Sequence, residues 1–275
     1  MVGNRKQRSS QVNSGRIPVV ILCGGMGTRM REETEFRPKP LVEVGGKPIL
    51  WHIMKIYSHY GYKRFVLCLG YKGHMIKEYF LDYRLMNNDF TLRLGSSKEA
   101  HFQSMPPCPE DWEITFADTG QEAMTGARVK RIRPYIREDC FMLTYGDGVA
   151  DIDISKLWEF HTHHAKIGTI TGVRPISRYG ELGVDGRVVK EFSEKPKSHD
   201  GVISGGFFVF HKRFFDYLSV DDGCVLEREP LERLARDGQL MVYRHNGFWH
   251  CMDTYRDFLG LNELWRKEAP WRMWG

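Results

Sequence analysis

A short apolar run, residues 17–22, leads directly into a turn that contains three glycines, Gly24–Gly27. Glycine has no Cβ and accepts positive φ, so such a turn brings backbone N–H groups close to a ligand at the carboxyl end of a strand. Arg29 and, ten residues further on, Lys39 add full positive charge to these N–H dipoles. The pattern predicts a β-strand followed by a phosphate-binding turn.

The turn differs from two widespread phosphate motifs. No Gly-Lys-Ser/Thr closes it as in a P-loop, and its glycine spacing is not that of the dinucleotide fingerprint. On the glycines alone, a strand-to-helix turn without any ligand is an equal alternative. Pro38 and Pro40 restrict the backbone on both sides of Lys39, which favours a lysine held in place for a phosphate.

Strand-like and helix-like segments alternate along the first half of the chain. The expected strands cover 17–23, 65–69, 114–117 and 141–145, and the expected helices 48–60, 74–86, 125–136 and 155–164. This succession predicts an α/β, Rossmann-like fold with a mostly parallel central sheet and helices on both faces.

The second half is richer in strands. Expected strands cover 167–173, 188–192, 203–210 and 240–243, with helices at 226–236 and 255–266. We therefore expect one domain, 17–275, in which 17–153 binds a nucleotide and the β-rich part, 154–275, binds a second substrate. Residues 1–16 are polar and basic and are predicted to form a flexible extension.

Composition limits the class of protein. The 275 residues are 41% hydrophobic and 27% charged, as in an ordinary globular chain, and the net charge of +5 suits anionic small molecules but is too weak to predict nucleic-acid binding. Six cysteines without a Cys-x-x-Cys pair predict free thiols in a reducing compartment. With neither a membrane-length apolar run nor a secretory signal, the chain is expected in the cytoplasm and away from membranes.

Two carboxylates are candidates for holding a metal. Asp147 follows the strand 141–145, where open α/β sheets bind ligands, and a carboxylate beside phosphates suits Mg²⁺. Asp253 would supply the second ligand, although Asp-Thr before a helix is also an ordinary N-cap, and Asp147 has the similar alternative of capping its turn. Spacing along the chain does not by itself pair the two.

Other candidates are weaker. Glu194 and Lys195 could bind a polyol and a phosphate together, near the close backbone approach that Gly205 permits, but on the residues alone a surface turn with an ion pair is the better explanation. His161 and His164 lie one helical turn apart without a carboxylate or thiol partner, so an exposed helix end is favoured over a metal site. No pattern indicates a serine or cysteine nucleophile.

Together these motifs resemble the sugar-nucleotide pyrophosphorylases. The resemblance narrows to the cytidylyltransferases that use glucose 1-phosphate, through Lys47–Lys55, Gly70–Gly73, Asp118–Gly126, Thr144–Asp151 and Gly205–Val209. It implies an Mg²⁺-dependent enzyme that transfers CMP from CTP to glucose 1-phosphate, giving CDP-glucose for deoxysugar or surface polysaccharide precursors. The family also tends to form homo-oligomers.

The resemblance assigns roles to particular positions. It implies that Arg29 and Lys39 are catalytic and that Asp147 and Asp253 bind Mg²⁺. The implied nucleotide contacts are Leu22, Cys23, Gly24, Gly25, Met26, Gly27, Thr28, Arg29, Lys39, Thr125, Arg128 and Gly146. The implied sugar-phosphate contacts are Gly180, Glu194, Lys195 and Gly205. A thymidylyl- or uridylyltransferase and a non-catalytic sugar-nucleotide-binding protein stay open as alternatives.

Overall fold

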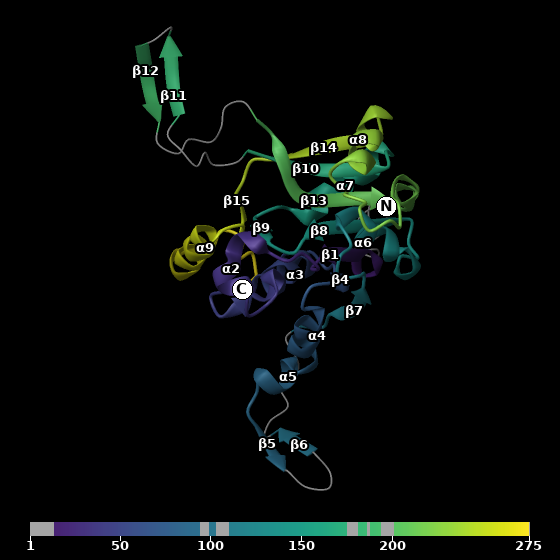
Figure 1. Cartoon of the computed structure of the whole chain (residues 1–275), viewed down its shortest axis with the longest axis vertical. Helices are drawn as coiled ribbons and strands as arrows, with labels where there is room; N and C mark the ends of the chain where they lie inside the picture. The colour runs from purple at the N-terminus through teal and green to yellow at the C-terminus, as the bar shows by residue number, and fades with distance from the viewer. Residues whose placement is uncertain are drawn as a thin grey trace, which may run out of the picture.

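A seven-stranded sheet forms the centre of the molecule (Figure 1). The computed structural model describes residues 14–93, 99–102, 110–174, 181–185, 188–193 and 201–274. The order of strands across the sheet is β14-β10-β13-β8-β1-β4-β7. In chain order they are β1 (Pro18–Leu22), β4 (Arg64–Leu69), β7 (Glu113–Asp118), β8 (Cys140–Tyr145), β10 (Gly168–Val173), β13 (Ile203–His211) and β14 (Leu240–His245).

The sheet is mostly parallel, as predicted. β1 pairs in parallel with β4 and β8, β4 with β7, and β10 with β14, whereas β13 runs antiparallel to both β8 and β10. Because β1 lies between β4 and β8, the glycine turn that follows it leaves the sheet between the carboxyl ends of two parallel strands. Open α/β sheets bind their ligands at this edge.

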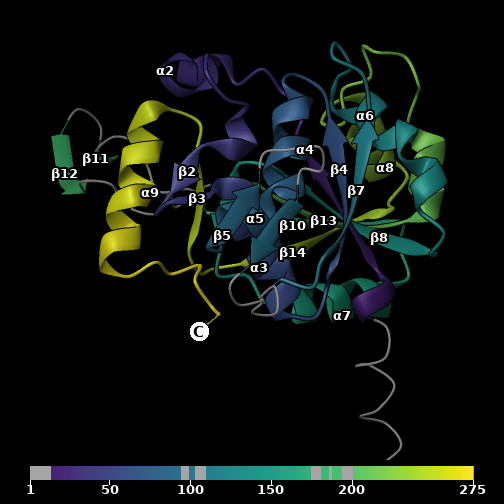
Figure 2. The same ribbon diagram turned by 90° about the horizontal axis from the view of Figure 1, so that it is seen from below.

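Helices cover both faces of the sheet, which confirms the predicted fold class (Figure 2). Alternate side chains of β1 point to opposite faces. Val19 and Ile21 join the apolar core that holds α3 (Ile49–His59) and α7 (Ile154–His164). Val20 and Leu22 join the core on the other face, with α6 (Thr125–Arg131) and α8 (Glu229–Arg236).

The remaining elements are smaller or peripheral. The other helices are α2 (Arg31–Thr34), α4 (Gly73–Leu81), α5 (Tyr83–Met86) and α9 (Tyr255–Lys267), with 3₁₀ turns η1 (Ser14–Arg16), η2 (Thr28–Met30), η3 (Lys39–Leu41), η4 (Arg133–Tyr135) and η5 (Lys212–Tyr217). Four two-stranded pairs complete the list: β2 (Glu43–Val44) with β3 (Lys47–Pro48), β5 (Phe90–Arg93) with β6 (Glu99–Phe102), β9 (Gly148–Ala150) with β15 (Trp249–Cys251), and β11 (Glu181–Asp185) with β12 (Val188–Ser193).

Three helices differ from the sequence expectation. The helix expected over 74–86 is divided at Asp82 into α4 and α5. The helix expected over 125–136 ends at Arg131, because Pro134 cannot continue its hydrogen bonds, and η4 follows. The helix expected from 226 begins only at Glu229. The β5–β6 and β11–β12 pairs, which Figure 1 shows extending from opposite ends of the molecule, were not expected as hairpins.

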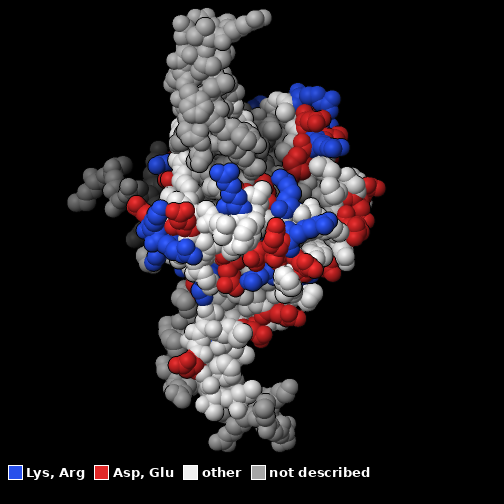
Figure 3. Space-filling model, turned by 60° about the vertical axis from the view of Figure 1, so that its left-hand side comes forward, with Lys and Arg blue, Asp and Glu red and all other residues white. Residues whose placement is uncertain are grey.

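Among the described residues on the face seen in Figure 3, charged side chains of both signs intermix and form no single-sign patch. Among the described residues, no helix is both long and apolar enough to cross a membrane. Cys23, Cys68, Cys140, Cys224 and Cys251 are free thiols. The predicted N-terminal extension lies almost wholly outside the described residues, and its flexibility stays a prediction, as does the division into two halves.

Candidate active site

The glycine turn after β1 has a conformation that only glycine adopts easily. Gly27 lies in the left-handed region, with φ 62° and ψ 33°, and its carbonyl oxygen accepts hydrogen bonds from Met30 N at 3.0 Å and Thr34 Oγ1 at 3.0 Å. At Gly24, a Cβ would lie 2.2 Å from Nη1 of Arg128. The first glycine therefore admits a neighbouring arginine, and the last sets the direction of the chain.

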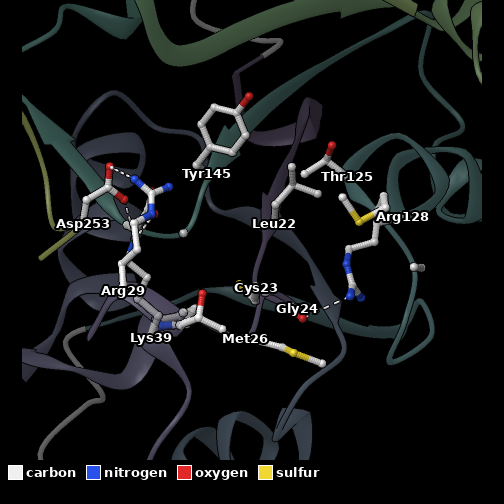
Figure 4. Close-up of a pocket in the computed structure, with 18 residues that line it drawn as sticks. Leu22, Cys23, Gly24, Met26, Arg29, Lys39, Thr125, Arg128, Tyr145 and Asp253 are labelled. Carbon is white, nitrogen blue, oxygen red and sulfur yellow. Dashed lines mark hydrogen bonds and ion pairs between the residues drawn. The ribbon is translucent and has the colours of Figure 1, made fainter. Parts of the chain in front are cut away.

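This turn lines a pocket of about 430 Å³ at the carboxyl edge of the sheet (Figure 4). Every position assigned to the nucleotide by the resemblance lines it. These positions are Leu22, Cys23, Gly24, Gly25, Met26, Gly27, Thr28, Arg29, Lys39, Thr125, Arg128 and Gly146. Both predicted metal ligands, Asp147 and Asp253, line the same pocket, so the fold gathers residues from distant parts of the chain.

Lys39 is held between two carboxylates. Pro38 is extended and Pro40 is buried, so the chain turns tightly through η3 and points the lysine inward. Lys39 Nζ donates to Asp147 Oδ2 at 2.6 Å and to Asp253 Oδ1 at 2.8 Å. Burial alone would lower the pKa of Lys39, but the charges and hydrogen bonds of these two carboxylates raise it. Lys39 is therefore protonated and positively charged at this position.

The two carboxylates meet because of a strand pair that spacing along the sequence did not predict. β9 pairs antiparallel with β15, and Met252 N donates to Asp147 O at 2.8 Å. Helix α9 is capped by Thr254 and Asp257 in a reciprocal capping box. The side chain of Asp253 is thus not the cap of α9, and its carboxylate faces Lys39 instead.

Asp253 also has a second cationic neighbour. Arg29 Nη1 lies 3.6 Å from Asp253 Oδ2, and the side chain of Arg29 is 74% exposed. Burial alone would raise the pKa of Asp253, but the hydrogen bond and charge of Lys39, with the charge of Arg29, lower it. Arg29 has no other ion pair among the described residues, so its guanidinium remains accessible to a ligand in the pocket.

Arg128 has a different environment although it borders the same pocket. It is buried, and its Nη1 donates to Leu69 O, Thr119 Oγ1 and Gly120 O at 2.7–3.0 Å. Its Nη2 donates to Gly24 O at 3.0 Å and to Gln121 O at 3.2 Å. One side chain thereby ties the turn after β1 to the ends of β4 and β7. We call this set of contacts the Arg128 brace.

A second pocket of about 270 Å³ adjoins the first. The two share Tyr145, Asp147 and Asp253 in their linings. The predicted sugar-phosphate contact Gly205 lines the second pocket, where its carbonyl oxygen accepts from Trp249 Nε1 at 2.7 Å. The other predicted contacts of this group, Gly180, Glu194 and Lys195, lie outside the described residues.

Sequence reasoning missed several lining residues. Tyr145, Trp249 and Cys251 border the second pocket, and none was assigned a role. Tyr145 could have been found, because it ends the strand that precedes Gly146 and Asp147. Trp249 and Cys251 could not, because only the pairing of β15 with β9 brings them to the site.

The described part of the chain offers no activated thiol at the turn. Burial, reinforced by nearby Cys68, raises the pKa of the Cys23 thiol well above its usual range, so it stays protonated. His161 Nδ1 and His164 Nε2 each lie within 2.8 Å of Thr169 Oγ1, so both rings are already engaged inside the protein. The site therefore combines cations, carboxylates and a glycine turn.

The chain is similar to known proteins along most of its length. The family model described as Nucleotidyl transferase matches residues 18–267. The chain is 48% identical over 258 residues to the glucose-1-phosphate cytidylyltransferase of Salmonella typhi, covering 93% of this chain and 98% of that protein. It has the same identity and coverage with the enzyme of that name from Salmonella typhimurium.

The chain belongs to the nucleotidyl transferase family. The relatives at 48% identity are named glucose-1-phosphate cytidylyltransferase, so the resemblance predicted from the sequence is confirmed. Among solved structures, HddC from Yersinia pseudotuberculosis matches with a TM-score of 0.65 and 24% identity, over 90% of this chain and 99% of that one. This last similarity supports the fold alone.

Proposed function

We propose that this chain transfers CMP from CTP to glucose 1-phosphate, giving CDP-glucose and pyrophosphate. An oxygen of glucose 1-phosphate forms a bond to the α-phosphorus of CTP, and the bond from that phosphorus to the pyrophosphate oxygen breaks. The substrates follow from relatives that are 48% identical over 93% of the chain. The residues for the chemistry follow from the pocket at the carboxyl edge of the sheet.

The observation that carries the proposal is the convergence of two carboxylates on one cationic position. Asp147 and Asp253 both reach Lys39 Nζ, at 2.6 and 2.8 Å, beside the glycine turn. Magnesium takes one or two protein carboxylates and completes its shell with phosphate and water, so this pair of oxygen donors fits it. Asp147 and Asp253 would hold Mg²⁺, which supplies positive charge to the phosphate oxygens of CTP.

Lys39 must then exchange partners when the substrates bind. Its ammonium group occupies the point on which both carboxylates converge. With CTP bound, Lys39 would turn to the phosphates, and Arg29, now 3.6 Å from Asp253, would do the same. The two cations stabilise the charge that develops on the α-phosphoryl group and on the leaving pyrophosphate.

The reaction needs no general base from the protein. The second pKa of a phosphate monoester is about 6, so the attacking oxygen of glucose 1-phosphate is already ionised at neutral pH. Positioning and charge stabilisation then account for catalysis, which agrees with a pocket that offers cations and carboxylates.

A panel of nucleotides tests the proposal. The purified protein is incubated with glucose 1-phosphate, Mg²⁺ and each of CTP, UTP, dTTP, GTP and ATP, and pyrophosphate release is measured. We expect CTP to give the highest kcat/KM. A preference for UTP or dTTP would select the uridylyl- or thymidylyltransferase alternative, and no release with any nucleotide or sugar phosphate would favour a binding protein.

The metal assignment has its own test. Replacing one oxygen donor in Asp147→Asn should lower turnover by about 100-fold, the scale of a single electrostatic group. Near-normal turnover in that variant would contradict the assignment. Formation of homo-oligomers, a location in the cytoplasm and a role in making deoxysugar or polysaccharide precursors stay predictions from the resemblance.

A further inference from the structure

One carboxylate outside the assigned site residues contacts two of the side chains that line the nucleotide pocket. Glu227 lies in the segment that leads into α8 and is exposed. Its Oε2 accepts from Thr125 Oγ1 at 2.7 Å, and its Oε1 accepts from the hydroxyl of Tyr145 at 2.5 Å. Figure 4 shows both hydroxyls on the same side of the pocket, with Leu22 between their side chains.

The backbone around Glu227 fixes this arrangement. Gly126 N and Ala127 N, in the first turn of α6, both donate to Cys224 O, at 2.9 and 3.1 Å. Leu226 is buried, and its N–H donates to Thr125 Oγ1 at 2.9 Å. The N–H groups of Gly126 and Ala127 are therefore already satisfied by protein and are not directed at a ligand phosphate.

The hydrogen-bond directions leave this wall with acceptors only. A carboxylate accepts and does not donate, so Thr125 and Tyr145 each donate their single O–H proton to Glu227. Toward the pocket, the unused capacity of the two hydroxyls is lone pairs. A ligand group that meets them favourably must carry a proton to donate.

The end of the pocket away from Thr125 has the reverse character. Arg29 and Lys39 are donors with positive charge, and Figure 4 shows them across Leu22 from Thr125, on the side where Tyr145 also lies. Phosphate oxygens accept hydrogen bonds and carry negative charge, so they are attracted to the cationic end and disfavoured beside Glu227. The two ends together can orient a ligand that has phosphates at one end and hydroxyls at the other.

We propose that Thr125 and Tyr145, oriented by Glu227, form an acceptor wall that binds hydroxyl groups of a substrate. This inference rests on the proposed function, whose two substrates both carry such groups, on the ribose of CTP and on the glucose ring. Tyr145 borders both pockets, so either sugar is within the reach of the same chemistry. Glu227 sets the polarity of this wall by accepting both protons.

Deoxy analogues of CTP and of glucose 1-phosphate test whether the acceptor wall binds substrate hydroxyl groups. The kcat/KM and the calorimetric Kd are measured for CTP against 2′-deoxy-CTP and 3′-deoxy-CTP, and kcat/KM for glucose 1-phosphate against its deoxy analogues. We expect the wild type to reject at least one analogue by about 10-fold or more, because its acceptors are then left without a donor. Rejection of a deoxy-CTP identifies the ribose as the bound group, and rejection of a deoxyglucose 1-phosphate identifies the glucose.

The variant Glu227→Gln should reduce that discrimination to within about 2-fold, because its amide NH₂ donates where the carboxylate accepted. Glu229→Gln, an exposed carboxylate two residues away that pairs with Arg233, is the matched control and should keep the wild-type ratio. If Glu227→Gln does not fold, Thr125→Val and Tyr145→Phe replace it in the same assay. If the wild type and the variants discriminate equally between each substrate and its deoxy analogue, the proposed acceptor wall is wrong. If the wild type is inactive with every pair of nucleotide and sugar phosphate, the proposed function is wrong instead.

Discussion

Arg29 and Arg128 border the same pocket, yet their guanidinium groups have different partners. Arg29 is 74% exposed, and its ion pair is with Asp253, a carboxylate that lines the pocket and also contacts Lys39. Arg128 is buried and makes five hydrogen bonds with protein oxygens, four of them backbone carbonyls. We therefore expect Arg29 to act on a ligand and Arg128 to support the fold, although both are arginines. The hydrogen-bond partners, not the charge, separate these roles.

The largest effect is expected at Lys39, the cation that both carboxylates contact. Lys39→Met removes the cation that meets both carboxylates and should lower kcat/KM by about 1,000-fold, the upper scale for one electrostatic group. Steady-state pyrophosphate release measures it. A loss below about 10-fold would mean that Lys39 belongs with Arg128, as a residue that serves the fold.

The same variant gives a readout that does not depend on turnover. Without Lys39, no ammonium competes for the point between Asp147 and Asp253. Binding of Mn²⁺ without nucleotide, followed by electron paramagnetic resonance, should become at least about 10-fold tighter than in the wild type, a change of 1.4 kcal/mol. Asp147→Asn is the control and should bind Mn²⁺ more weakly. Equal affinity in wild type and Lys39→Met would rule out the exchange of partners.

Arg128→Gln should instead show itself in stability. The shorter, neutral amide leaves most of the five acceptors unpaired in a buried place, and the free energy of unfolding should fall by about 4 kcal/mol. Urea unfolding measures the loss. Arg133→Gln is the matched control, because Arg133 is 60% exposed and its ion pair with Asp216 is long, at 3.8 Å. A brace variant as stable as the control would show that the contacts of Arg128 do not support the fold.

His52 extends the comparison to a buried group that titrates. Burial outweighs its hydrogen bond with Val44 O and lowers its pKa from 6.5 to about 4. The unfolded chain therefore binds more protons between pH 6.5 and 4, so stability falls as the pH drops through this window, by about 3 kcal/mol for this residue. His161, whose pKa burial and His164 also lower to about 4, contributes in the same window. Unfolding at several pH values should show a shallower slope in His52→Phe, and an unchanged slope would contradict the neutral state of His52.

Arg29→Ala should lower activity and leave stability almost unchanged, in contrast to Arg128→Gln. Because its side chain is exposed, the unfolding free energy should change by less than about 0.5 kcal/mol, while kcat/KM falls by about 100-fold. Parallel urea and kinetic measurements give both values. A stability loss near that of Arg128→Gln would erase the distinction between the two arginines.

The smallest effect is expected from the backbone of the turn. Gly27→Ala places a Cβ at φ 62° and 2.7 Å from Thr34 Cγ2, which should cost about 1–2 kcal/mol of stability. Gly25→Ala is the control, because no atom of the described residues lies within 4 Å of a Cβ there. Thermal unfolding of the two variants should separate them, and equal melting temperatures would mean that the turn tolerates a side chain at both glycines.

Much of this site could be predicted from the sequence because its residues follow local rules. The strand before Gly24 and the prolines around Lys39 are set by neighbours in the chain, so the glycine turn and the position of Lys39 could be predicted without the fold. The parallel sheet follows from the alternation of strands and helices.

Contacts between distant segments could not be predicted in this way. Only the pairing of β9 with β15 brings Asp253 to Asp147, and only the packing of 224–227 against α6 places Glu227 on Thr125. The resemblance implies that Arg128 contacts the nucleotide, which stays a prediction, but its five protein acceptors, at Gly24, Leu69 and residues 119–121, could not be predicted. Sequence patterns identify a charged residue, but its partners depend on the tertiary fold.

The most direct test of the central claim follows the phosphorus atoms of CTP. The wild-type protein is incubated with glucose 1-phosphate, Mg²⁺ and CTP labelled either at the α- or at the γ-phosphorus, and the products are separated. We predict that the α label appears in CDP-glucose and the γ label in pyrophosphate. Transfer of the γ label to the sugar, or no transfer of either label, would contradict cytidylyl transfer at this site.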